Sequence, residues 1–88
     1  MSLVYIDKDG NKYTKRQFDA AIKDALARKL KGYRVPKHRL DDAVIVVAKM
    51  IRLGISVDAN CKERPEVIVN NFADGDVQFI LSKIRGLQ

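Results

Sequence analysis

This chain of 88 residues lacks several features that other classes of protein need. It has one cysteine, Cys61, so an internal disulfide is excluded. Its longest unbroken apolar run, Ala43–Ala48, is far shorter than the ~20 residues of a transmembrane helix. A secretory signal begins with a basic segment followed by an apolar stretch, and this sequence does not open in that way. We therefore expect a soluble protein of the reducing cytoplasm, without a membrane partner.

The residues that carry common enzyme chemistry are also sparse. Each glycine stands alone at a predicted turn or helix end, so no phosphate-binding loop is present. The single histidine, His38, lies in a different predicted element from Cys61 and has no evident acid to orient it. Asp7–Asn11 has glycine in the fourth position, whereas a calcium loop needs it in the sixth. The sequence therefore predicts a non-enzymatic protein that holds no metal ion and no cofactor.

The composition is that of a small folded domain. The chain is 47% hydrophobic and 32% charged, which is ordinary for a globular protein. We expect one domain, residues 1–88, with a β-hairpin in 1–13 and a helical bundle in 14–88. A domain of this size buries only somewhat more than ~60% of the surface of its unfolded chain. The stability of the folded monomer is therefore marginal, and homodimerisation is the simplest way to supplement its small core.

The N-terminal residues predict a β-hairpin and the start of a helix. Leu3–Ile6 is a short β-rich run, Asp7–Asn11 is a turn in which glycine supplies a positive φ, and Lys12–Tyr13 is the return strand. Two strands alone are barely stable in water, so the hairpin must lean on a helix or pair with another chain. Thr14 and Gln17 have the spacing of a capping box, which predicts that a helix begins there.

Apolar residues at spacings of three and four then predict the buried stripe of this first helix. They are Phe18, Ala21, Ile22, Ala25, Leu26 and Leu30. Gly32 predicts the C-terminal stop. Tyr33–Val35 is expected to be extended, because the residue before Pro36 is restricted to extended backbone. A second helix is predicted from Lys37 or His38 to Leu53, with Gly54 as its terminator.

Two shorter helices are predicted at the C-terminal end. Residues 55–64 are the least regular stretch, and Pro65 precedes a predicted helix over Glu66–Phe72. A turn over Ala73–Asp76, with Asp76 as N-cap, precedes another over Val77–Arg85. The expected fold is mostly α, a small bundle of about four helices preceded by an N-terminal β-hairpin.

The net charge of +6 is concentrated in one segment, Lys23–Arg39, which holds seven cations and one anion, Asp24. A clustered charge attracts polyanions, because its field survives screening over a Debye length of ~8 Å. A tight helix-loop-helix corner would gather cations for phosphate contacts, with an aromatic ring available to stack on a base or sugar. The candidate nucleic-acid-binding residues are Arg28, Lys29, Lys31, Tyr33, Arg34, Lys37, His38 and Arg39.

A purely structural interpretation of these charges competes with that hypothesis. Cations in the last turn of a helix stabilise its macrodipole, and Asp19–Lys23 and Asp24–Arg28 have the spacing of helical ion pairs. Lys37 and Arg39 are different, because positive charge at the start of the second helix opposes the dipole. This penalty favours a polyanion partner.

A helix-turn-helix formed by the two terminal helices is disfavoured, because Val77–Arg85 is too apolar to be an exposed recognition helix. The sequence therefore predicts nucleic-acid binding mainly through phosphates, by a cytoplasmic, dimer-forming helical module that acts as an accessory regulator. The alternative is a homodimeric adaptor for protein interaction or assembly, without nucleic-acid binding. Apolar residues on more than one face of the terminal helices, in Val67–Val69 and Phe79–Leu81, motivate that alternative.

Overall fold

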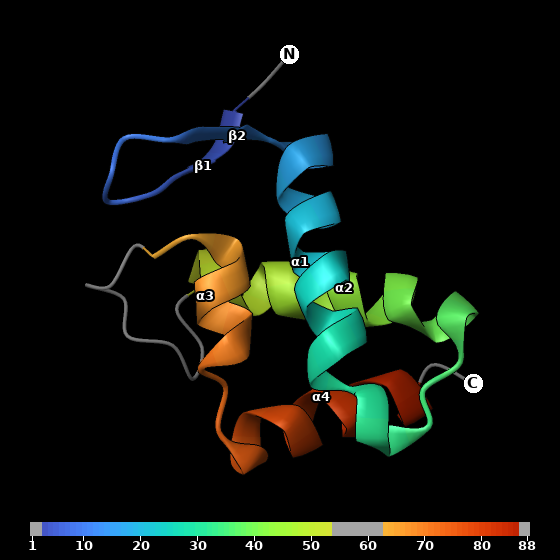
Figure 1. Ribbon diagram of the computed structural model, residues 1–88. Helices are drawn as coiled ribbons and strands as arrows, with labels where there is room; N and C mark the ends of the chain where they lie inside the picture. Colours follow the sequence, from blue (N-terminus) through green and yellow to red (C-terminus); the bar gives the residue numbers. More distant parts are fainter. Residues whose placement is uncertain (1–2, 54–62, 87–88) are drawn as a thin grey trace.

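The computed structural model describes residues 3–53 and 63–86, and Figure 1 shows their arrangement. In this part of the chain a two-stranded antiparallel hairpin precedes four α-helices, which confirms the predicted mostly α fold. The elements are β1 (Leu3–Ile6), β2 (Lys12–Thr14), α1 (Lys15–Lys29), the 3-10 turn η1 (Lys31–Tyr33), α2 (Lys37–Leu53), α3 (Pro65–Asn70) and α4 (Asp74–Gly86). The predictions for Gly54 and Cys61, and that for residues 55–62, lie outside the described residues.

The hairpin leans on α1, as one of the two sequence-based alternatives expected. Tyr5 pairs with Tyr13 across the strands, and a bulge lies between Leu3 and Tyr5. The Tyr5 ring stacks on Phe18 of α1 with ring centroids 5.1 Å apart, and its hydroxyl donates to the carbonyl of Glu63 at 2.6 Å. Since two strands alone are marginal, these contacts to α1 and to the residues before α3 stabilise the hairpin.

The buried carboxylate of Asp7 organises the hairpin turn. It accepts hydrogen bonds from the backbone N–H groups of Asp9 and Asn11, both at 2.9 Å, and from the Asn11 amide and the Tyr13 hydroxyl, both at 3.0 Å. Burial raises the pKa of Asp7, but the hydrogen bonds from Asn11, Tyr13 and Asp9 outweigh burial and hold this pKa below its usual 3.8. Gly10 has a φ of 86°, so the predicted glycine turn is confirmed.

The start and the buried face of α1 also follow the sequence. The N–H of Gln17 donates to the Thr14 hydroxyl at 3.3 Å, and the Gln17 side chain accepts from the N–H of Thr14 at 3.0 Å. This reciprocal pair is the predicted capping box. Of the predicted stripe, Ala21 is half-buried, whereas Phe18, Ile22, Ala25, Leu26 and Leu30 are buried.

The core lies where the helices meet. α1 packs against α2 and α3, and α2 packs against α4, so that α4 lies beneath α1 and α2 in the view of Figure 1. Every helix contributes to this core. Its buried apolar residues are Phe18, Ile22, Ala25, Leu26, Leu30, Leu40, Ala43, Val44, Val47, Ala48, Met50, Ile68, Val69, Phe72, Val77, Ile80, Leu81 and Ile84.

The ion pairs on α1 differ in part from the prediction. Arg28 pairs with Asp24 at 2.7 Å, as expected. The predicted pair of Asp19 with Lys23 is wrong: Asp19 pairs with Lys15 at 2.8 Å, and Lys23 pairs with Asp41 of α2 at 2.9 Å. Lys23 lies beside α2, so a carboxylate from the neighbouring helix replaces the one on its own helix.

The boundaries of the last two helices also needed correction. α3 covers Pro65–Asn70 and therefore ends two residues earlier than predicted. α4 begins at Asp74, within the predicted turn, and Asp76 is not its N-cap. The carbonyl of Ala73 accepts from Val77 at 3.1 Å, and the Asp76 carboxylate accepts from the N–H of Ala73 at 3.3 Å. Ala73 is therefore the N-cap, and Asp76 reaches back to it from inside the first turn.

Candidate nucleic-acid interface

The segment Arg28–Arg39, called the basic corner below, is built from the end of α1, η1 and the start of α2. The N–H of the buried residue Leu30 donates to the carbonyl of Leu26 at 2.8 Å. The N–H of Tyr33 donates to the carbonyl of Leu30 at 3.0 Å and closes the 3-10 turn. The chain therefore reverses around a buried leucine, and residues 31–34 are exposed.

Two predictions about this reversal are wrong. Gly32 lies within η1 and does not have the left-handed φ of a helix-terminating glycine; Arg34 takes that conformation, with φ 55° and ψ 43°. Tyr33 and Arg34 are consequently not extended, although Val35, before Pro36, belongs to no helix. The reason is that η1 prolongs helical hydrogen bonding beyond α1, so the chain reverses after Gly32.

The backbone of Arg34 is strained in this position. A left-handed conformation costs a residue with a Cβ about 1–2 kcal/mol, and glycine adopts it freely. The Arg34 side chain is exposed, and it makes no hydrogen bond or ion pair with any residue that the structure describes. Within those residues, no side-chain interaction offsets the cost of placing an arginine here.

Three cations of the basic corner already have partners. Arg28 pairs with Asp24, and Arg39 pairs with Asp42 at 3.2 Å. The Nζ of Lys29 donates to the carbonyl of Asn70, at the end of α3, at 2.9 Å. These side chains therefore have structural roles in the free protein.

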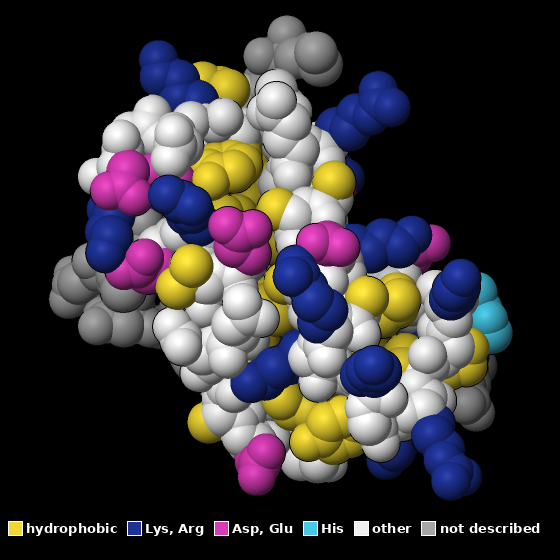
Figure 2. Space-filling view, in the orientation of Figure 1, with side chains coloured by type: hydrophobic (Ala, Val, Ile, Leu, Met, Phe, Trp, Pro, Cys, Tyr) yellow, Lys and Arg dark blue, Asp and Glu magenta, His cyan; other side chains and the backbone are white. Residues whose placement is uncertain are grey.

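The other three cations, Lys31, Arg34 and Lys37, are exposed and have no such partner in residues 3–53 and 63–86. We call these three the free cations. His38 is exposed beside them. Figure 2 shows lysine and arginine side chains gathered over the end of α1 and the start of α2, with hydrophobic side chains between them. The cations of the basic corner therefore come from one continuous stretch of chain, the end of α1, η1 and the start of α2.

The start of α2 adds to this positive field. α2 begins at Lys37, as predicted, and its first turn contains no acidic residue. The carboxylate of Asp41 is directed to Lys23, and that of Asp42 to Arg39. The helix N-terminus carries about half a positive charge, so cations in the first turn raise the local potential further.

A pocket lies beside the basic corner, between α4 and residues 34–36, the loop that joins η1 to α2. The residues around it include an arginine that the sequence-based site lacked. The pocket has a volume of about 200 Å³. Its lining residues are Tyr33, Arg34, Val35, Pro36, Arg39, Leu81, Ile84 and Arg85. Arg85 comes from the last turn of α4, far away in the sequence. Only the packing of α4 against α2 brings it here, and no local sequence signal reports that packing.

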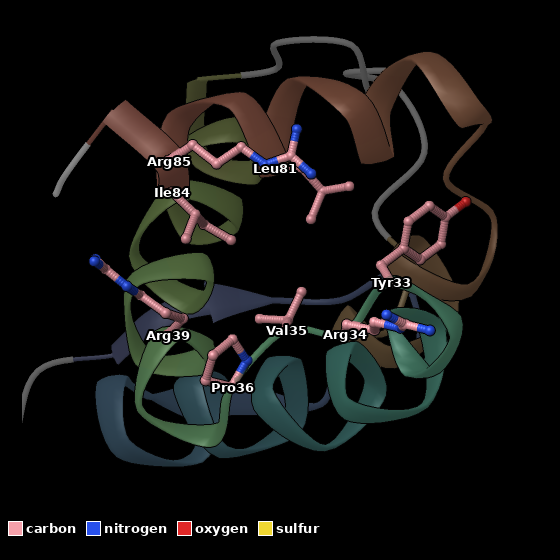
Figure 3. A pocket seen from close by; sticks show the side chains of 8 residues that line it. All are labelled: Tyr33, Arg34, Val35, Pro36, Arg39, Leu81, Ile84 and Arg85. Atoms are coloured by element: carbon pink, nitrogen blue, oxygen red, sulfur yellow. The ribbon is translucent and has the colours of Figure 1, made fainter.

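Figure 3 shows how the pocket residues are directed. Val35 lies in the middle, facing Leu81 and Ile84, and the Arg85 side chain extends along α4 above them. The guanidinium groups of Arg34 and Arg39 point away from each other. The pocket is therefore apolar inside and cationic at its rim.

No three His, Cys, Asp or Glu side chains among residues 3–53 and 63–86 are grouped so that they could hold a metal ion. The described helices include none with the length and hydropathy of a membrane span. Comparison of the chain with protein-family models, with curated proteins and with solved structures found no match.

Proposed function

We propose that this protein is a small, non-enzymatic module that binds nucleic acid mainly through phosphate contacts and acts as an accessory regulator. The observation that carries the proposal is the group of free cations, Lys31, Arg34 and Lys37, exposed together at the basic corner. Uncompensated cations at one place attract a polyanion, because the phosphates relieve the mutual repulsion of the cations. The cations in turn release counterions that are condensed on the nucleic acid.

The energetics of the corner support this proposal. Lys37 opposes the dipole of α2, and Arg34 has a strained backbone, so both positions lower the stability of the free protein. A glycine at position 34 and an acidic residue in the first turn of α2 would be more stable. Residues that break local rules without a structural gain are typical of functional sites.

The directions of the side chains favour a repeating anion over a single small one. The free cations come from three successive elements, η1, the loop and α2. The guanidinium group of Arg34 also points away from that of Arg39, which is paired with Asp42 (Figure 3). One small anion cannot contact diverging groups, whereas successive phosphates of a nucleic-acid backbone can. Most of the apolar side chains of α4, including Ile80 and Leu81, are buried, so this helix is not a recognition helix that reads bases.

A charge-matched pair of variants tests the proposal. The variant Lys31→Ala/Arg34→Ala/Lys37→Ala removes the free cations. The control Lys12→Ala/Arg16→Ala/Lys49→Ala removes the same residue types and the same charge from exposed positions outside the basic corner, on β2, near the start of α1 and near the end of α2. Fluorescence anisotropy with a labelled single-stranded oligonucleotide is expected to show loss of binding in the first variant and near wild-type binding in the control. Equal retention by both variants would remove the proposal.

The alternative, a homodimeric adaptor, has one observation in its favour. Leu3 and Ile6 on β1 are 49% and 47% exposed, and β1 has only β2 beside it in the described sheet. Its original motivation is weaker, because Ile68, Ile80 and Leu81 are buried within the monomer. Light scattering at micromolar concentration tests it: a dimer that Leu3→Lys dissociates supports the adaptor, and a strict monomer excludes it.

A further inference from the structure

We infer that the pocket between the loop and α4 receives one unpaired base of a single-stranded nucleic acid, while the cations around it contact the adjoining phosphates. This inference rests on the proposed function and names the form of nucleic acid that the basic corner binds. It adds Arg85 to the site, a residue that lies outside the basic segment of the sequence.

The interior of the pocket suits a flat apolar surface. Val35 and Pro36 line it from the loop, and Leu81 and Ile84 line it from α4. Its volume of about 200 Å³ is below the ~300–1,000 Å³ of pockets that enclose drug-sized ligands. The pocket therefore has room for one small ring system, and the rest of the ligand must stay outside.

The rim of the pocket supplies groups that recognise a nucleotide. Tyr33 is 39% exposed at one side, so its ring is available to stack on a base. Arg34 and Arg85 are exposed at the edge, and the Arg85 side chain lies above Leu81 in Figure 3. Within a strand, each base is flanked on either side by a backbone phosphate. A pocket with an apolar interior and a cationic rim therefore matches a base within a strand.

The same geometry excludes a base that stays within a duplex. Paired bases are stacked above and below, and their edges alone are accessible in the grooves. Removing a base from a duplex costs a few kcal/mol of unstacking and unpairing, and a single strand avoids most of that cost. The pocket therefore favours single strands, loops or strand ends over continuous duplex.

The test compares two ligands that differ only in their bases. One is a thymidine oligomer of about ten nucleotides, within the ~4–16 nucleotides that single-strand-binding folds cover. The other has the same backbone and phosphates with abasic sites throughout. The wild-type protein is expected to bind the thymidine oligomer about 5- to 150-fold more tightly, the fold-change that corresponds to stacking of one base. Wild-type protein is used for both ligands, so no variant has to fold.

Two variants then assign the preference to the pocket. Tyr33→Ala is expected to reduce the thymidine affinity to that for the abasic oligomer, and Tyr33→Phe is expected to retain the difference, because phenylalanine keeps the ring. Affinity for a blunt duplex of equal length is expected not to change in Tyr33→Ala. Since Tyr33 is exposed and outside the core, both variants should fold, and circular dichroism checks this.

The outcomes separate this inference from the proposed function. Equal affinity for thymidine and abasic oligomers, lost for both in the variant that removes the free cations, overturns the base pocket and leaves phosphate binding standing. Absence of binding to either oligomer overturns both proposals. A poly-glutamate peptide that binds as tightly as the thymidine oligomer overturns both in favour of an acidic protein partner.

Discussion

Removing the free cations should change how the affinity for nucleic acid depends on salt. Each phosphate contact releases condensed counterions, and for single strands the slope of log affinity against log salt is about −0.7 for each phosphate neutralised. The slope therefore counts the cations that contact phosphates. The variant Lys31→Ala/Arg34→Ala/Lys37→Ala removes three of them and is expected to make the slope shallower by about 2.

The structure sets the expected slope of the wild-type protein. Lys31, Arg34, Lys37 and Arg85 are exposed and without an ion pair in the part of the chain that the structure describes. Four phosphate contacts give a slope of about −2.8, and the affinity then falls roughly 50-fold between about 50 and 200 mM salt. In the triple variant only Arg85 remains of these four cations, so the slope is about −0.7 and the affinity falls about threefold over the same salt range.

A steeper slope would show that the paired cations also bind phosphates. If Arg28, Lys29 and Arg39 left Asp24, Asn70 and Asp42 to contact the ligand, seven contacts would give about −4.9. The loss of affinity over the same salt range would then be roughly 900-fold. The salt titration therefore distinguishes a site that uses only free cations from one that rearranges existing pairs.

Fluorescence anisotropy of the thymidine oligomer at five or so salt concentrations measures these slopes. The control Lys12→Ala/Arg16→Ala/Lys49→Ala carries the same net charge as the variant, so it separates local contacts from the general attraction of a basic protein. Its slope should stay near that of the wild type. Equal slopes for the two triple variants would refute the assignment of phosphate contacts to the basic corner.

Two further predictions concern stability. Arg34→Gly should raise the free energy of unfolding by up to about 1 kcal/mol, because glycine relieves the left-handed strain while adding chain entropy, and it should remove one phosphate contact. Thermal unfolding measures the first effect, about 4–8 °C per kcal/mol, and a lower Tm would contradict it. Asp7→Asn should lower the Tm at neutral pH and flatten its decline in acid. The pKa of Asp7 is below 3.8 in the folded state, so its stabilisation is present above that value and is lost as the pH falls through the folded pKa. Wild-type and variant Tm curves that run parallel from about pH 7 to about pH 2 would contradict this role of Asp7.

The elements that depend on short-range chemistry were predictable from the sequence. The capping box of Thr14 and Gln17, the turn at Gly10 and the start of α2 after Pro36 each involve residues within four positions of one another. The buried face of α1 was predictable for the same reason, since a helical period places it without knowledge of its partner.

The errors arose where two local signals compete. Gly32 is the usual residue to end a helix, yet the chain continues into η1 and reverses at Arg34. Asp76 has the chemistry of an N-cap, but the same carboxylate also caps from inside the first turn, so α4 begins at Asp74. Local propensities for these positions differ by about 1 kcal/mol, and tertiary packing outweighs differences of that size.

The sequence by itself determined that four helices follow a hairpin in the described chain and that positive charge gathers between the first two long helices. Spacing and charge count fix these properties, because both act between residues close in the chain. Only the tertiary structure decided which cations are free: Lys29 bonds to Asn70, Lys23 pairs with Asp41, and Arg85 lines the same pocket as Tyr33. Those relations join residues far apart in sequence, and they exist only once the apolar faces of the helices have packed together.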